Sequence, residues 1–170
     1  MLLLKTLRYR VKDKQSGKRL AAAARAVNIV WNHCNAAQRH ALARNQRWVT
    51  KLSLFQSTKG SSRDLGISAQ TVQAVCEEYD MRRRETRRRH LRWRSNNRSL
   101  GWVPFKNQVI RITGSVATLY GTKIRLWLHR PIEGRIKCGN FSQDARGRWY
   151  INLSVEYEAK ERSALDDVGV

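Results

Sequence analysis

The N-terminal residues alternate between apolar and basic side chains. Arg8 and Arg10 fall on one side of the alternation, and Tyr9 and Val11 fall on the other. A period of two is typical of a β-strand with one buried face. We therefore expect residues 1–12 to form a strand whose exposed face is basic.

A helical period follows the first turn. Residues 18–42 carry apolar side chains three and four positions apart, which is the spacing of one buried helix face. The stripe consists of Leu20, Ala23, Val27, Val30, Trp31, Cys34, Ala37 and Ala41. A shorter helix is indicated at residues 49–56. Ser68 has a side chain suited to an N-cap, and the stripe after it predicts one helix of about 25 residues, ending near Trp93.

The character of the chain changes after residue 101. Short runs rich in β-branched and aromatic residues are separated by turns with glycine, proline or aspartate, and Asp144–Gly147 parts two alternating runs in the manner of a β-hairpin. Residues 102–159 therefore predict a small antiparallel sheet or barrel of four to six strands. The expected fold class is α+β.

The order strand, helices, strands suggests a domain plan. If residues 1–12 join the later strands, residues 13–100 form a helical insertion into a β domain that resumes at residues 101–160. The last residues, 161–170, are expected to be a polar linker.

Basic residues dominate the charge. The chain has 34 Lys and Arg against 13 Asp and Glu, a net charge of +21, and 23 of those basic residues lie in the first 100 positions. Such a domain is expected to bind a polyanion. Arginine suits phosphate, and the absence of an apolar face beside the charge argues against a membrane surface.

The densest charge lies in Met81–Arg94, with eight arginines in 14 residues. On a helix they would point nearly all round, so we expect them to face solvent or phosphate. A merely solvated helix face is the alternative interpretation. The arginines are Arg82, Arg83, Arg84, Arg87, Arg88, Arg89, Arg92 and Arg94.

Other chemistry has little support in the sequence. Cys34, Cys76 and Cys138 are far apart and lack the spacing of a metal site, so we expect free thiols. The N-terminal apolar run ends at Lys5, which predicts neither a signal peptide nor a membrane span and favours a cytoplasmic protein. We expect no catalytic residue, metal site or cofactor within this chain.

Four stretches carry a resemblance to a known family. They are ARAVNIVWNHCNA (24–36), ISAQTVQAVCEEYDMRRRE (67–85), GRIKCGNFSQDARGRWYINLSVEYEA (134–159) and the terminal DDVGV. In this order the chain resembles the N-terminal half of TnpB, the transposon-associated RNA-guided nuclease family, and of the related compact type V CRISPR effectors.

The resemblance implies a division of labour. The β part would be a wedge domain and the helical insertion a recognition lobe, which together hold guide RNA and read a short motif beside a double-stranded DNA target. In the family a Val-Gly strand like Val168–Val170 leads into the first RuvC-like aspartate, so the carboxylates that bind Mg²⁺ are expected beyond residue 170. We interpret Asp166 and Asp167 as exposed linker acids.

The resemblance also suggests roles for individual residues. The arginine run and, on the strands, Arg111, Lys123 and Arg125 would contact nucleic-acid backbone. Motif reading would fall to Ser68, Gln70 and Gln73 on one helix and to Trp48, Thr50 and Lys51 before it. Trp102 is open to two interpretations, base stacking or core packing, whereas Trp31, Trp127 and Trp149 are expected in the core.

Two other readings stay open at this point. One is a stand-alone DNA-binding regulator or transposon accessory protein that uses its helices directly on duplex DNA. The other is an enzyme whose nuclease domain is supplied separately. The sequence does not distinguish a transposon guide from a CRISPR guide, and it leaves the DNA motif and the oligomeric state open.

Overall fold

The computed structural model describes residues 1–106 and 109–159, and its first element is strand β1 (Leu2–Val11). Tyr9 and Val11 are buried while Arg8 and Arg10 are exposed, so the predicted alternation is confirmed. β1 lies inside the sheet, between the last strand and a strand from the middle of the chain.

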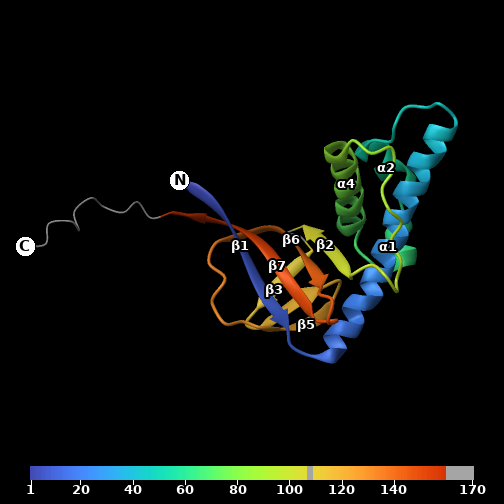
Figure 1. Cartoon of the computed structure of the whole chain (residues 1–170). Helices are drawn as coiled ribbons and strands as arrows, with labels where there is room; N and C mark the ends of the chain where they lie inside the picture. Colours follow the sequence, from blue (N-terminus) through green and yellow to red (C-terminus); the bar gives the residue numbers. More distant parts are fainter. Residues whose placement is uncertain (107–108, 160–170) are drawn as a thin grey trace, which may run out of the picture.

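Seven strands form a nearly closed antiparallel barrel, in the order β2-β6-β7-β1-β5-β4-β3 (Figure 1). The later strands are β2 (Trp102–Lys106), β3 (Ile110–Thr113), β4 (Val116–Leu119), β5 (Thr122–Trp127), β6 (Arg135–Gln143) and β7 (Trp149–Glu158). β6 and β7 form the expected hairpin. The predicted α+β class with a small antiparallel barrel is confirmed, and the expected linker at 161–170 lies outside the described residues.

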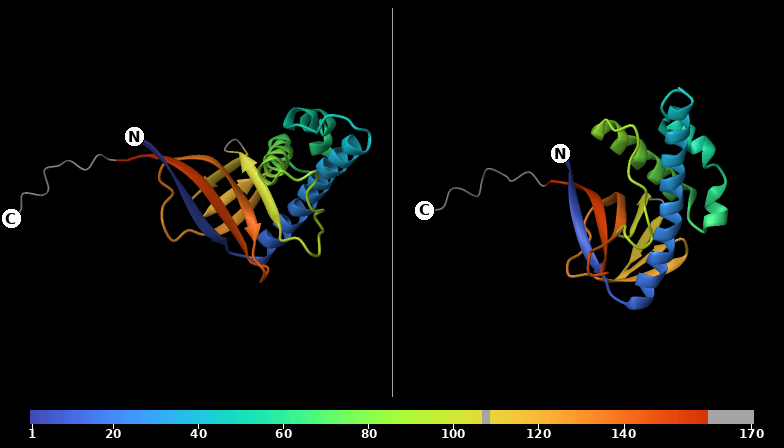
Figure 2. Two further views of the ribbon diagram at one scale, coloured as in Figure 1. Left: turned by 45° about the horizontal axis from the view of Figure 1, so that its top comes forward. Right: turned by 45° about the vertical axis from the view of Figure 1, so that its right-hand side comes forward.

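The helices follow β1 in the chain and gather on one side of the barrel (Figure 2). They are α1 (Lys14–Ala43), α2 (Lys51–Ser57), α3 (Ser61–Leu65) and α4 (Ala69–Thr86). Asp13 caps α1, since its carboxylate accepts a 2.7 Å hydrogen bond from the Ser16 amide, and this bond lowers the pKa of Asp13. In Figure 2, α1 extends from the barrel to the far end of the helical lobe.

The predicted helix of about 25 residues was wrong. α4 ends at Thr86, and its C-cap Arg87 has a left-handed backbone with φ 52°. Residues beyond it are not helical, although Ser68 is the N-cap as expected and accepts a bond from the Thr71 amide. The cause of this early ending lies in contacts with α1, described below.

The buried core has one part inside the barrel and another between the helices. Side chains such as Tyr9, Phe105 and Phe141 fill the barrel, and Val30, Cys34, Val75, Cys76 and Tyr79 join α1 to α4. Trp149 is buried as predicted. Trp127 is 54% exposed, so its assignment to the core was wrong, because it lies on the outer face of β5. None of the helices in the described residues is long and apolar enough to cross a membrane.

Two glycines test the packing of the barrel, Gly139 between strands and Gly17 where α1 meets β7. A Cβ at Gly139 would lie 2.3 Å from the Asn152 carbonyl oxygen and 2.8 Å from the Phe105 ring. We expect Gly139→Ala to lower the free energy of unfolding by about 3 kcal/mol, because overpacking cannot be relieved against backbone. Gly17 lies in α1, and the new Cβ of Gly17→Ala would lie 3.4 Å from the Trp149 ring, which is an acceptable contact. We expect this change to raise the free energy of unfolding by up to about 1 kcal/mol, because alanine favours the helix more than glycine does.

Urea unfolding followed by circular dichroism measures both changes. Equal stability of Gly139→Ala and the wild type would contradict the close approach of β6 to β7.

Candidate nucleic-acid interface

Three asparagines on one face of α1 hold the chain that follows α4. We call residues 87–100 the strap. The Asn35 side chain donates to the Leu91 carbonyl (2.8 Å) and accepts from the Leu91 amide (3.2 Å). Asn32 makes the same pair of bonds with the backbone of Arg94, both at 2.8 Å. Each side-chain amide therefore stands in for one residue of a neighbouring strand.

Further bonds complete this attachment. The Trp31 indole donates to the Arg92 carbonyl (3.0 Å), and Asn28 accepts from the Arg94 guanidinium (2.7 Å). Asn28 and Asn32 lie four residues apart, and Asn35 three further on, so all share one helix face. Residues 91–95 are not helical, because α1 rather than a further turn of α4 satisfies the backbone groups of Leu91 and Arg94.

Tyr79 ties α4 to the same face of α1. Its hydroxyl donates a 2.9 Å bond to the Asn35 side-chain oxygen, which also accepts from the strap. Burial raises the pKa of Tyr79 to about 12, so the hydroxyl keeps its proton at neutral pH. Asn35 thus joins three segments of the lobe at one buried side chain.

The strap concentrates unpaired positive charge. Between residues 87 and 100 there are six arginines and no acidic residue. Five of them, Arg87, Arg88, Arg89, Arg92 and Arg98, are exposed, while Arg94 is partly buried against Asn28. α1 holds the backbone of residues 91–94, and the exposed arginines lie before, within and after this stretch of the chain.

The arginines on α4 differ from those on the strap. Arg83 is buried and pairs with Asp80 at 3.2 Å, and Arg84 pairs with the same carboxylate at 2.9 Å. Arg82 pairs with Glu78 at 2.7 Å. The prediction that all eight arginines face solvent or phosphate was therefore wrong for Arg83, because Asp80 neutralises it inside the lobe.

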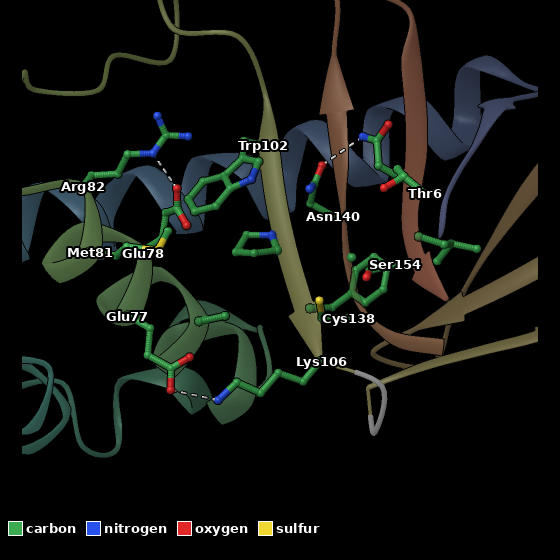
Figure 3. Close-up of a pocket in the computed structure, with 16 residues that line it drawn as sticks. Thr6, Glu77, Glu78, Met81, Arg82, Trp102, Lys106, Cys138, Asn140 and Ser154 are labelled. Atoms are coloured by element: carbon green, nitrogen blue, oxygen red, sulfur yellow. Dashed lines mark hydrogen bonds and ion pairs between the residues drawn. The ribbon is translucent and has the colours of Figure 1, made fainter. Parts of the chain in front are cut away.

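A hollow of about 490 Å³ separates α4 from the outer face of the barrel (Figure 3). Its helical wall carries Glu77, Glu78, Met81 and Arg82, and Glu77 forms an ion pair with Lys106 of β2 at 3.1 Å. The barrel wall is mostly uncharged and combines apolar side chains such as Trp102 and Pro104 with polar ones. Its side chains include Thr6, Asn140, Asn152 and Ser154.

The residues expected to read a DNA motif are not brought together. The Arg83 guanidinium lies 4.7 Å from the centre of the Trp48 ring, near the C-terminal end of α4. Gln73 is exposed in the N-terminal half of the same helix. The ten residues from 73 to 83 correspond to about 15 Å of helix. Trp48, Thr50 and Lys51 therefore form one group, and Ser68, Gln70 and Gln73 form another.

Local roles account for two members of these groups. The Thr50 side chain caps α2 in a capping box with Ser53, and the Ser68 side chain caps α4. Their hydroxyls are thus engaged with backbone amides. Lys51 and Gln73 are exposed, and Trp48 is 40% exposed.

A second basic surface lies on the barrel. Arg111 of β3 and Lys123 of β5 flank Thr118 of β4 in register, and Arg125 follows two residues after Lys123. All three cations are exposed on the same outer face. The structure therefore brings together the three strand cations that were predicted from the sequence to contact nucleic-acid backbone.

Trp102 combines the two interpretations that the sequence left open. Its ring is partly buried and meets Trp31 edge-on at 6.2 Å, while Arg94 lies 5.7 Å over it. It also lines the hollow of Figure 3. Trp102 is thus packed on the lobe and accessible at the hollow.

Sequence reasoning missed the asparagine face of α1. The signal was present, because asparagine is unusual inside a long helix and recurs here at positions 28, 32 and 35. What it binds was not visible, since the strap is more than 50 residues away in the chain.

Comparison with known proteins adds no assignment: no protein-family model matches the chain, and no curated protein matches it significantly. Within residues 1–106 and 109–159, no group of three or more His, Cys, Asp and Glu side chains is arranged to hold a metal ion. Asp166 and Asp167 lie outside the described residues.

Asn35 should be the most sensitive point of the strap's attachment. Asn35→Ala strips partners from the Tyr79 hydroxyl and from both backbone groups of Leu91, so we expect a loss of about 2–3 kcal/mol in the free energy of unfolding. Faster hydrogen exchange of the Leu91 amide should accompany it.

The matched control is Asn97→Ala, on the exposed part of the strap, which should change stability by less than about 0.5 kcal/mol. A similar small effect for Asn35→Ala would refute the role assigned to this side chain.

Proposed function

We propose that this chain is the non-catalytic guide-RNA and target-DNA binding module of a TnpB-like RNA-guided nuclease. The barrel would act as the wedge domain and the helical lobe as the recognition lobe. The observation that carries the proposal is the strap, which has six arginines and no carboxylate of its own, and whose residues 91–94 are held on α1 by side-chain amides.

The energetics of the strap favour a bound polyanion. Exposed arginines this close together repel one another, and the repulsion is relieved when phosphates neutralise them. On α4, directly before the strap, the chain does pair its arginines, as Asp80 and Glu78 show. Within the described part of the chain, the charge of the strap lacks such partners and is available to an external anion.

The barrel contributes surfaces of a different kind. Arg111, Lys123 and Arg125 supply a second set of cations for RNA phosphate. Beside α4, the amides and hydroxyls of the hollow can hydrogen-bond to ribose and base edges, which supports recognition of RNA. Neither surface requires a catalytic group.

The test is to express the chain within its own genetic locus and to sequence the RNA that remains bound after a high-salt wash. One structured RNA encoded beside the gene is the expected result. A random RNA mixture that salt removes would overturn the guide-binding proposal and favour the stand-alone DNA-binding protein.

The strap should dominate the salt dependence of binding. For a DNA duplex, replacing Arg88 and Arg89 by glutamine should make the slope of log K against log salt shallower by about 1.8, because each phosphate contact contributes about 0.9. Fluorescence anisotropy over a salt series measures this slope.

The control has the same charge change elsewhere. Arg130 and Arg146 are exposed in loops of the barrel, and replacing both by glutamine should leave the slope nearly unchanged. Equal slopes for the two double variants would mean that net charge, not the strap, governs binding.

A further inference from the structure

Three tryptophans from distant parts of the chain line one cleft beside the strap. The cleft has a volume of about 550 Å³, which is in the range of about 300–1,000 Å³ typical of ligand pockets. Trp31 comes from α1, Trp93 from the strap and Trp102 from β2. The cleft adjoins the hollow of Figure 3, since Glu78, Arg82 and Trp102 line both.

Two of the three indole rings are fixed by packing. Trp31 meets Tyr79 edge-on at 5.2 Å and Trp102 edge-on at 6.2 Å, and its indole nitrogen is bonded to the strap. Trp102 lies beneath the Arg94 guanidinium. These rings form the rigid inner wall of the cleft.

Trp93 is the exposed ring of the cleft, with 48% of its surface accessible. Its backbone neighbours on both sides are held by α1, Arg92 through the Trp31 indole and Arg94 through Asn32. The backbone that carries the ring is therefore held in place, and solvent reaches the ring itself. A rigid exposed aromatic lowers the entropic cost of binding a flat partner.

The charge around the cleft selects for an anionic ligand. Arg92 is exposed, and the Arg82 side chain is 60% exposed beside its partner Glu78. Arg39 lies over the Trp93 ring, 5.1 Å from its centre. The cleft thus combines an apolar aromatic interior with guanidinium groups at its edge, which matches a flat base attached to a phosphate.

We propose that the tryptophan cleft binds one unpaired nucleobase of the bound RNA, stacked on Trp93, with its phosphates on Arg92 and Arg82. The inference rests on the proposed RNA binding and extends it, because it makes the lobe select an unpaired nucleotide rather than duplex backbone alone. The base enters the cleft, and the strap arginines bind the phosphates of the RNA strand on either side of that nucleotide.

The test compares two blunt-ended RNA duplexes, without loops, that differ by one nucleotide. One duplex is fully paired and the other carries a single bulged adenosine, and the Kd of each is measured by fluorescence anisotropy at one salt concentration. The wild-type chain should bind the bulged duplex about tenfold more tightly, which is within the effect of one base–aromatic stack.

Variants separate stacking from structure. Trp93→Ala should abolish the preference while the paired duplex keeps its Kd, and Trp93→Phe should retain most of the preference. Trp127→Ala removes another exposed tryptophan, outside the cleft, and should leave the preference intact.

Other outcomes would overturn one or both proposals. If the wild type binds neither duplex, the proposed function fails and the inference with it. If the wild type binds both duplexes equally, or if Trp93→Ala keeps the preference or weakens binding of both duplexes alike, the inference fails while RNA binding stands.

Discussion

The helical lobe depends on hydrogen bonds between the side-chain amides of α1 and the backbone of the strap. An amide side chain presents an N–H donor beside a carbonyl acceptor, as the backbone of a strand does, so Asn32 and Asn35 can each pair with a residue as a β-strand would. These side-chain amides take the place of a neighbouring strand, so the backbone N–H and C=O groups of Leu91 and Arg94 are bonded although the segment lies against a helix. Tyr79 adds α4 to the same asparagine, so one buried contact relates three segments.

The barrel sets the position of this lobe. β1 lies between β7 and β5 in the barrel. α1 follows directly after β1, with Asp13 as its N-cap, so the helix begins where the first strand leaves the barrel. β2 returns from the strap to the edge of the sheet, and Trp102 at its start contacts Trp31 of α1. The two ends of the helical insertion are thus both anchored in the barrel, and the hollow of Figure 3 lies between α4 and the strands β2, β6 and β7.

The arginines of α4 are paired with carboxylates, whereas those of the strap have no such partner among the described residues. The buried Asp80 compensates the buried Arg83, since an unpaired charge inside the lobe would be costly, and it also pairs with the exposed Arg84. The strap has no carboxylate of its own, and its exposed arginines stay available to an external anion. Exposed aromatic side chains accompany cations elsewhere in the chain, as Arg39 over Trp93 and Lys12 over Trp127 illustrate.

The sequence by itself determined the elements whose cause is local. Alternation in β1, the three-four spacing of α1, the cap at Ser68 and the hairpin turn at Asp144–Gly147 all follow from neighbouring residues. Tertiary structure decided where α4 ends and which arginines are free. Those outcomes depend on Asn32, Asn35 and Asp80, whose side chains act on groups brought near by folding, and local periodicity carries no information about such contacts.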